Sequence, residues 1–138
     1  MNPDVLILAR ETNQGEPDVN IQQMSLQDVE DGQFTAAVMS QMLHHLSPAE
    51  AVNMLNTTMR KVSTGIIISD FIRSKLNYYL AKLAISLTNP TRFNLIDGPL
   101  SILRSYTDQE IAQIMKEAGI TKYKIYNFLL RKIIVIKK

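Results

Sequence analysis

The sequence contains no cysteine, and this absence removes several kinds of chemistry at once. Disulfide-stapled folds, cysteine-based zinc sites and thiol nucleophiles are excluded. A chain without thiols suits a reducing compartment, and the first residues, Met1-Asn2-Pro3-Asp4, lack the basic start and long apolar stretch of a signal peptide. We therefore expect an intracellular, cytoplasmic protein.

Long hydrophobic runs and a strong excess of one charge are also missing. No apolar run approaches the roughly 20 residues that cross a bilayer, so no membrane span is expected. The formal net charge of +2 is too small to indicate a nucleic-acid partner, because a phosphate-tracking surface needs a basic stripe. Hydrophobic residues make up 46% of the chain, which suffices for one small folded domain over residues 1–138.

The order of periodic segments predicts an α/β fold. Strands that alternate with helices indicate a mostly parallel sheet with helices on both faces, and a closing hairpin indicates that the last strand runs against the others. The predicted elements, in chain order, are a helix over 2–12, strands over 19–24 and 34–40, a helix from 47 to about 63–65, a strand over 66–71, a helix over 76–87, an irregular segment over 91–105, a helix over 107–118, and strands over 123–128 and 132–136.

Several helix ends carry recognisable capping residues. Ser47 is followed three residues later by Glu50, and Thr107 by Glu110, and both pairs have the pattern of a capping box. Asn2 is suited to cap the first helix, Pro90 to stop the helix over 76–87, and Gly119 to end the last helix.

Three segments, taken in order, resemble the second half of the class I S-adenosylmethionine-dependent methyltransferases. Residues 1–10 (MNPDVLILAR) are similar to the segment after the family's second strand. Residues 33–46 (QFTAAVMSQMLHHL) resemble its fourth strand and the turn that follows, and 103–120 resemble its late helix. The resemblance implies a partial Rossmann-like sheet, S-adenosylmethionine as cofactor and a small-molecule acceptor.

The sequence departs from the family at the cofactor loop. The family's glycine-rich turn is absent, since the five glycines are scattered, and the ribose-binding acid would precede Met1. We therefore expect a truncated domain of doubtful activity. In the family, strand one lies between strands two and four, so residues 34–40 would form an unpaired edge. We expect self-association or completion by another chain.

The resemblance implies a set of site residues at the carboxyl ends of the strands. Ser25, Leu26, Ser40, Gln41 and Met42 are the expected cofactor contacts, with Ser25 standing where the family often has an aspartate.

Asp70, at the end of a predicted strand, and His45, one of two adjacent histidines, are the candidate catalytic residues. Asp70 is equally suited to cap a turn, and both histidines, His44 and His45, to stabilise one. Adjacent histidines without cysteine or a carboxylate partner do not indicate a metal site.

Residues 72–105 fall where the family places substrate-covering insertions, so they predict a helical lid. The leucines at 76, 80, 83 and 87 form a stripe that we expect to pack on the domain, with Tyr79 beside it. Tyr78, Tyr79 and Tyr106 are candidates to shape a small apolar pocket. Two alternatives stay open: a non-catalytic binding domain that kept the scaffold, and a membrane-surface protein that uses this helix.

Overall fold

The computed structural model describes residues 3–15, 18–87 and 92–138, and the chain forms two compact units. Unit 1 comprises residues 1–30 and unit 2 comprises residues 31–138. The sequence had indicated a single domain over residues 1–138.

Unit 1 contains α1 (Pro3–Thr12) and the short 3-10 helix η1 (Leu26–Asp28). The predicted first helix is confirmed, although its proposed cap, Asn2, lies outside the described residues. The strand predicted over 19–24 is wrong, because residues 19–24 have no regular structure. Alternation alone does not make a strand: a strand also needs a neighbour for its backbone groups, and here the Arg10 side chain donates to the carbonyl of Ile21 (3.2 Å).

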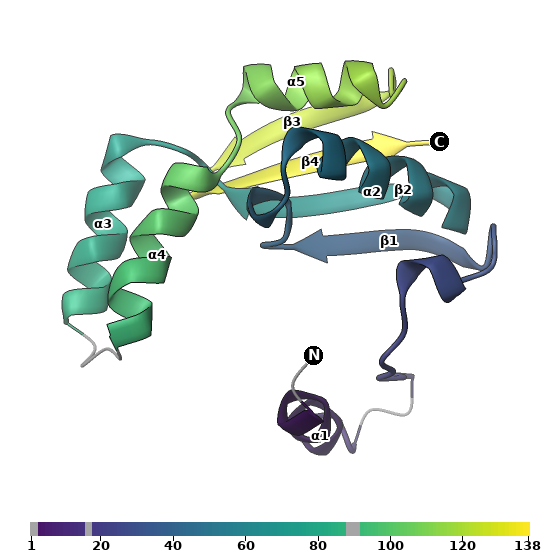
Figure 1. Cartoon of the computed structure of the whole chain (residues 1–138), viewed down its shortest axis with the longest axis horizontal. Coiled ribbons are helices and arrows are strands. Elements are labelled where there is room, and N and C mark those ends of the chain that lie inside the picture. The colour runs from purple at the N-terminus through teal and green to yellow at the C-terminus, as the bar shows by residue number, and fades with distance from the viewer. Residues whose placement is uncertain (1–2, 16–17, 88–91) are drawn as a thin grey trace. The chain divides into compact units, whose positions relative to one another are not determined.

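Unit 2 is built on a four-stranded sheet in the order β1-β2-β4-β3 (Figure 1). The strands are β1 (Phe34–Ser40), β2 (Val62–Phe71), β3 (Tyr123–Phe128) and β4 (Arg131–Lys137). β1 and β2 are parallel, and β4 is antiparallel to both β2 and β3. Three strands therefore run one way and the last runs against them, which confirms the predicted fold class.

The start of β2 differs from the prediction. The helix α2 (Pro48–Lys61) ends at Lys61, and β2 begins at once with Val62, so Gly65 lies within the strand. A Cβ atom on Gly65 would come within 2.1 Å of the Ile136 carbonyl oxygen of β4. Gly65 is thus needed for close approach of two strands, whereas the sequence suggested that it ended a helix.

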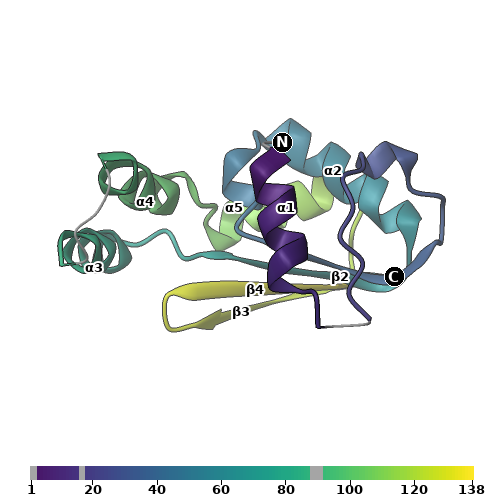
Figure 2. The same ribbon diagram turned by 90° about the horizontal axis from the view of Figure 1, so that it is seen from below.

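Two helices, α2 and α5 (Asp108–Glu117), cover the same face of this sheet (Figure 2). Both predicted capping boxes are confirmed, Ser47 with Glu50 and Thr107 with Glu110. Gly119 ends α5 with a φ of 69°, and the next amide, of Ile120, donates to the Met115 carbonyl (2.8 Å). The second layer of helices expected from the sequence is not part of the described unit 2.

The core lies between these helices and the sheet. Alternate strand residues point toward α2 and α5, and each large aliphatic side chain buried there contributes about 1.5–3 kcal/mol. The cluster consists of Leu43, Ala51, Leu55, Val62, Ile66, Ile68, Ile111, Ile114, Met115, Ile120, Ile134 and Ile136.

The predicted lid is a helical hairpin of α3 (Lys75–Ser86) and α4 (Arg92–Arg104). The irregular segment predicted over 91–105 is therefore wrong. A Cβ atom on Gly98 would lie 2.4 Å from the Ile85 side chain, so this glycine lets α4 approach α3 closely. Pro90, the expected helix stop, lies outside the described residues.

The leucine stripe of α3 does not pack on the domain, contrary to the prediction. Leu76, Leu83 and Leu87 are exposed by 66%, 57% and 77%, and Tyr79, expected in the core, by 65%. The residues of α3 that pack inward lie on the opposite side of the helix, and they include the buried Asn77. A period of hydrophobic residues marks one helix face but does not tell whether that face meets protein.

Candidate functional site

The carboxyl ends of the parallel strands β1 and β2 lie side by side. Ser40 pairs with Ser69 at the last position of the β1–β2 register. The backbone amide of Gln41, the next residue, donates a hydrogen bond to the Ser69 carbonyl (2.8 Å). Ser40, Gln41 and Met42 are all exposed at this end of the sheet. The structure therefore brings together three of the residues proposed as cofactor contacts.

The other two proposed contacts, Ser25 and Leu26, belong to unit 1. Ser25 caps η1, in a capping box with Asp28 that the sequence analysis did not identify. These two residues therefore stay a prediction as cofactor contacts.

A buried pair of side chains, His44 and Asp70, lies behind the exposed strand ends. The Nδ1 atom of His44 is 2.7 Å from Oδ1 of Asp70, and the His44 backbone amide donates to Oδ2 (3.0 Å). His44 comes from the 3-10 helix η2 (Leu43–His45), and Asp70 is the residue before the last of β2. The two residues are only 5% and 4% exposed, so the pair fixes the turn after β1 to the end of β2.

The tautomer of His44 follows from its partner. An ionised carboxylate only accepts hydrogen bonds, so Nδ1 carries the proton and donates to Asp70. In a neutral ring the other nitrogen, Nε2, then has a free lone pair. This is the arrangement in which a carboxylate orients an imidazole for proton transfer.

His45, the histidine favoured by the sequence analysis, lies beside His44 with ring centroids 4.1 Å apart. Its side chain is exposed, and among the described residues no hydrogen bond holds its ring. The structure thus places His44, and not His45, next to Asp70.

Contacts of Arg131 with Phe71 and Gln41 join the hairpin of β3 and β4 to the ends of β1 and β2. The Arg131 guanidinium lies over the Phe71 ring at 4.9 Å. When the side-chain amide of Gln41 is oriented so that its oxygen faces Arg131, this oxygen accepts hydrogen bonds from both terminal nitrogens of the Arg131 guanidinium (2.9 and 2.6 Å). Gln41 has a φ of 53°, a left-handed conformation that is uncommon for a residue other than glycine and that concentrates at functional sites.

Gln41, the two histidines and Phe71 line a cavity of about 320 Å³, which we call the strand-end cavity. Its walls come from the end of β1, from η2, from the end of β2 and from helices α3 and α4. The lining residues are Gln41, His44, His45, Phe71, Ile85, Asp97, Gly98 and Ser101. A cavity with an imidazole at one wall and the hairpin of α3 and α4 at another can position a small polar molecule.

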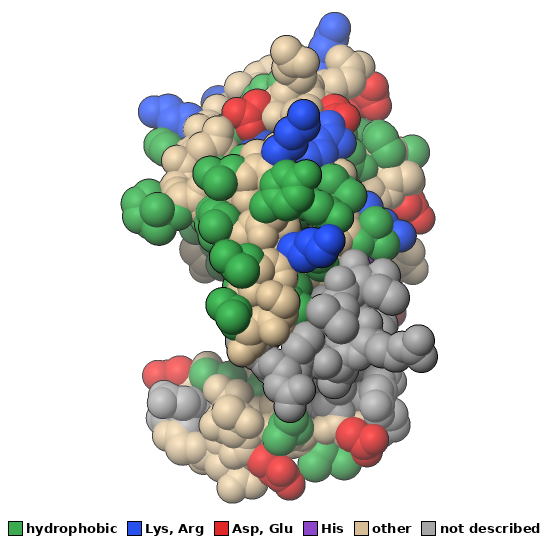
Figure 3. Space-filling view, turned by 90° about the vertical axis from the view of Figure 1, so that its left-hand side faces the viewer, with side chains coloured by type: hydrophobic (Ala, Val, Ile, Leu, Met, Phe, Trp, Pro, Cys, Tyr) green, Lys and Arg blue, Asp and Glu red, His purple; other side chains and the backbone are tan. Residues whose placement is uncertain are grey.

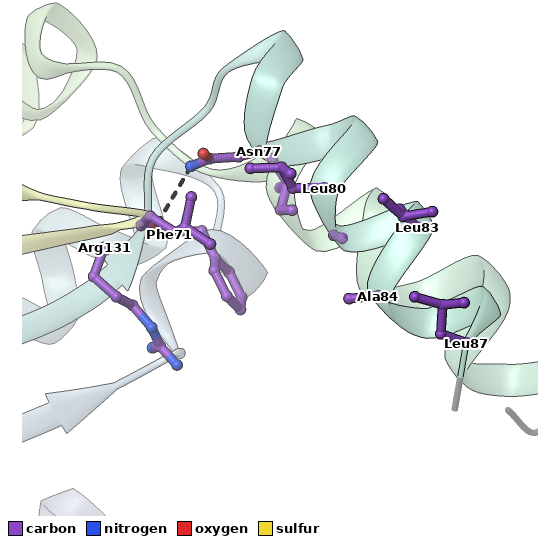
Figure 4. A pocket seen from close by; sticks show the side chains of 10 residues that line it. Phe71, Asn77, Leu80, Leu83, Ala84, Leu87 and Arg131 are labelled. Carbon is purple, nitrogen blue, oxygen red and sulfur yellow. Dashed lines mark hydrogen bonds between the residues drawn. The ribbon is translucent and has the colours of Figure 1, made fainter. Parts of the chain in front are cut away.

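A larger and more apolar cleft of about 530 Å³, the α3 cleft, opens beside the strand-end cavity (Figure 4). Leu80, Leu83, Ala84 and Leu87 of α3 line one side, and Phe71 and Arg131 lie at the other. None of the three tyrosines proposed to shape an apolar pocket lines it. Instead, the Tyr106 hydroxyl donates to the Leu46 carbonyl at 2.5 Å.

The start of α5 is tied to β4 by a buried lysine. The Lys132 ammonium lies 2.6 Å from Oδ1 of Asp108 and donates to the Tyr106 carbonyl (2.8 Å). The hydrogen bond from Lys132 holds the pKa of Asp108 below its usual value. This contact anchors the segment between α4 and α5 to the sheet.

The sequence did not identify Phe71 and Arg131 as site residues, and of the two histidines it favoured His45 over His44. The predicted hairpin carried a signal for Arg131, because β4 pairs antiparallel with β2 and so opposes Arg131 to Phe71. No comparable signal distinguished His44 from His45, since only the three-dimensional turn decides which ring faces Asp70.

Within residues 3–15, 18–87 and 92–138, no group of three or more metal-binding side chains gathers to hold an ion. No helix in the same ranges has the length and hydrophobicity needed to cross a membrane.

No protein-family model and no curated protein matches this sequence. Solved structures do match it. A SAM-dependent methyltransferase from Aquifex aeolicus gives a TM-score of 0.68 at 15% identity, over 99% of this chain and 64% of that one. Human N-acetylserotonin methyltransferase, solved in complex with SAM, gives 0.66 at 10% identity, over 99% and 38%. A SAM-dependent methyltransferase from Archaeoglobus fulgidus gives 0.65 at 14% identity, over 99% and 73%.

The chain has the fold of the class I S-adenosylmethionine-dependent methyltransferases. The resemblance inferred from three sequence segments is thereby confirmed at the level of the fold. The chain spans 64% and 38% of the length of the first two of these methyltransferases.

Proposed function

We propose that this chain contributes the acceptor-facing part of an S-adenosylmethionine-dependent methyltransferase that acts on a small organic molecule. The observation that carries the proposal is the position of the buried His44–Asp70 pair beside the carboxyl ends of two parallel strands. In open α/β sheets, ligands bind at this end of the strands.

The residues present fit part of the cofactor. Ser40, Gln41 and Met42 offer exposed side chains and strand-end backbone that would contact the adenosyl part, with Ser25 and Leu26 as further proposed contacts. No glycine-rich turn is available among the five scattered glycines to bring backbone close to the rest of the molecule. When bound, the cofactor supplies an electrophilic methyl group.

The chain's own residues would align the acceptor, exclude water and accept a proton. Methyl transfer from a sulfonium depends chiefly on alignment. Asp70 holds the Nδ1 proton of His44, so Nε2 is the atom that would accept a proton from an acceptor hydroxyl. His45 lines the same cavity and is the other candidate base.

We further propose that another strand completes the sheet at β1. Among the described residues, β1 pairs only with β2, so its outer edge presents unpaired backbone groups. The completing strand belongs to a longer polypeptide, to a complementing chain or to a second copy.

The alternative function is a non-catalytic binding domain that retained the scaffold. Two observations favour it: the sequence lacks a glycine-rich turn, and His44 and Asp70 are 5% and 4% exposed, which suits a structural pair.

Calorimetric titration with S-adenosylmethionine and S-adenosylhomocysteine separates the two functions. Ser40→Tyr, which fills the carboxyl end of β1, should weaken binding at least tenfold. Thr35→Tyr, at the other end of the same strand and also exposed, should change it less than twofold. A folded chain that binds neither compound, or that binds equally in both variants, would reject the methyltransferase proposal.

A further inference from the structure

The outward face of α3 is apolar, which is the reverse of the usual arrangement in a surface helix. Leu76, Leu80, Leu83 and Leu87 project away from the side that packs inward through Asn77. Figure 3 shows hydrophobic side chains in a row on the face of unit 2 that carries the lid. Contiguous exposed apolar surfaces mark sites of interaction or ligand binding, whereas single scattered hydrophobic residues on a surface do not.

Three of these leucines line the α3 cleft, and one does not. Leu80, Leu83 and Leu87 belong to its wall, together with Ala84 and Ile102, whereas Leu76 lies on the same helix outside the cleft. The exposed stripe is therefore the rim of a concave space, and a ligand chain inserted there would meet aliphatic side chains along its length (Figure 4).

One charged group lines this apolar cleft. Of the described residues that line it, Arg131 alone is charged, and no carboxylate among the described residues forms an ion pair with it. The one polar neighbour in the wall, Asn77, already donates to the carbonyls of Ile72 (2.8 Å) and Leu130 (3.3 Å). Arg131 contacts Gln41 and Phe71, but its charge is not neutralised by a described carboxylate. Such a cation at the end of an aliphatic wall complements an amphiphile with a negatively charged or strongly polar head.

The α3 cleft also borders the strand-end cavity. Phe71 lines both spaces, and its ring is close to the Arg131 guanidinium (4.9 Å) and to the His44 ring (5.5 Å between centroids). A molecule with its tail along α3 and its head near Arg131 would have that head beside Gln41 and His44.

We propose that the α3 cleft binds the hydrocarbon chain of an amphiphilic acceptor whose polar head lies at Arg131, next to the strand-end cavity. This inference rests on the proposed function in naming the acceptor class, but binding of the chain can be measured without the cofactor. A membrane surface or a second copy of the chain would use the whole leucine stripe, whereas a single amphiphile uses only the leucines of the cleft.

The test is a titration of the full chain with octanoate, decanoate and dodecanoate below their micelle concentrations. Each added methylene should tighten binding roughly fourfold until the cleft is full. Leu83→Gln should weaken dodecanoate binding at least tenfold. The control Leu76→Gln, on the same exposed stripe of α3 but outside the cleft, should change it less than twofold. Arg131→Gln should weaken dodecanoate binding more than dodecanol binding.

Equal losses in Leu76→Gln and Leu83→Gln, or affinity that does not depend on chain length, would overturn the inference. Association with anionic vesicles that both leucine variants abolish would assign the stripe to a membrane surface, and dimerisation lost in both would assign it to a second copy; either result also overturns it. Loss of S-adenosylmethionine binding with intact, length-dependent dodecanoate binding would reject the proposed function and leave this site standing.

Discussion

His44 and Asp70 are separated by 26 residues in the sequence, and their side chains meet at 2.7 Å in the interior of unit 2. Asp70 accepts three hydrogen bonds, from the His44 ring, the His44 amide and the Phe71 amide. The turn after β1 is thereby fixed to the end of β2, so the position of the strand-end cavity depends on one carboxylate.

Asp70→Asn should lower the free energy of unfolding by about 1–3 kcal/mol, because a buried acceptor of charged character is replaced by an amide that cannot accept all three bonds. Urea unfolding measures the loss. In a double-mutant cycle with His44→Gln, the two losses should not add. Additive losses would mean that the pair is not coupled in solution.

His44 also illustrates what the sequence could and could not predict about the site. The motif at 43–46 and Asp70 were both recognised, and the strand ends that carry Ser40 to Met42 were placed correctly. Neighbouring side chains on a turn such as η2 point in different directions, and the sequence does not tell which of the two faces Asp70. The assignment of the general base to His44 or to His45 stays a prediction.

The two histidines can be separated by methyl-transfer kinetics in an assembly in which the chain is active. His44→Gln should reduce the turnover number by about 10²–10⁴-fold, the usual contribution of a general base. His45→Gln lies in the same cavity and is the matched control, with an expected change below threefold. A larger loss in His45→Gln would assign the base to His45.

Gly65 shows why the helix boundary was misplaced and gives a sharp test of the sheet. Glycine after a helical period predicts a helix end, but here the cause is the Ile136 carbonyl, 2.1 Å from where a Cβ would stand. Gly65→Ala should therefore destabilise unit 2 by about 1–3 kcal/mol through overpacking.

The control for this substitution is Gly15→Ala, since nothing lies within 4 Å of a Cβ there. Thermal unfolding of the two variants compares them directly. Equal stability of both would mean that β2 and β4 do not pair in the register described.

The contact between Asp108 and Lys132 should give the stability a defined pH dependence. The hydrogen bond from Lys132 lowers the pKa of Asp108 in the folded state below its ordinary value of 3.8. A carboxylate with a lowered folded pKa stabilises the fold above the unfolded pKa, and this stabilisation is lost as the pH falls through the folded pKa.

Asp108→Asn should accordingly be less stable than the parent at neutral pH, and the difference should narrow below about pH 4. Urea unfolding at a series of pH values measures it. The control Asp18→Asn removes an exposed carboxylate, and the difference between its free energy of unfolding and that of the parent should stay the same across the pH series. A difference for Asp108→Asn that is constant down to about pH 2 would show that the Lys132 contact does not depend on the carboxylate charge.

The outer edge of β1 should decide how the chain associates. Val38 is 73% exposed on this strand, and a lysine on an edge strand opposes pairing with another strand because its charge would have to be desolvated. We expect the parent chain to self-associate as its concentration rises, and Val38→Lys to shift it toward the monomer in sedimentation velocity. Leu76→Lys places the same charge on α3, away from the edge, and should leave edge pairing intact. A parent chain that stays monomeric and highly soluble at all concentrations would contradict the proposal that β1 takes another strand, since its backbone edge would then be satisfied by water alone.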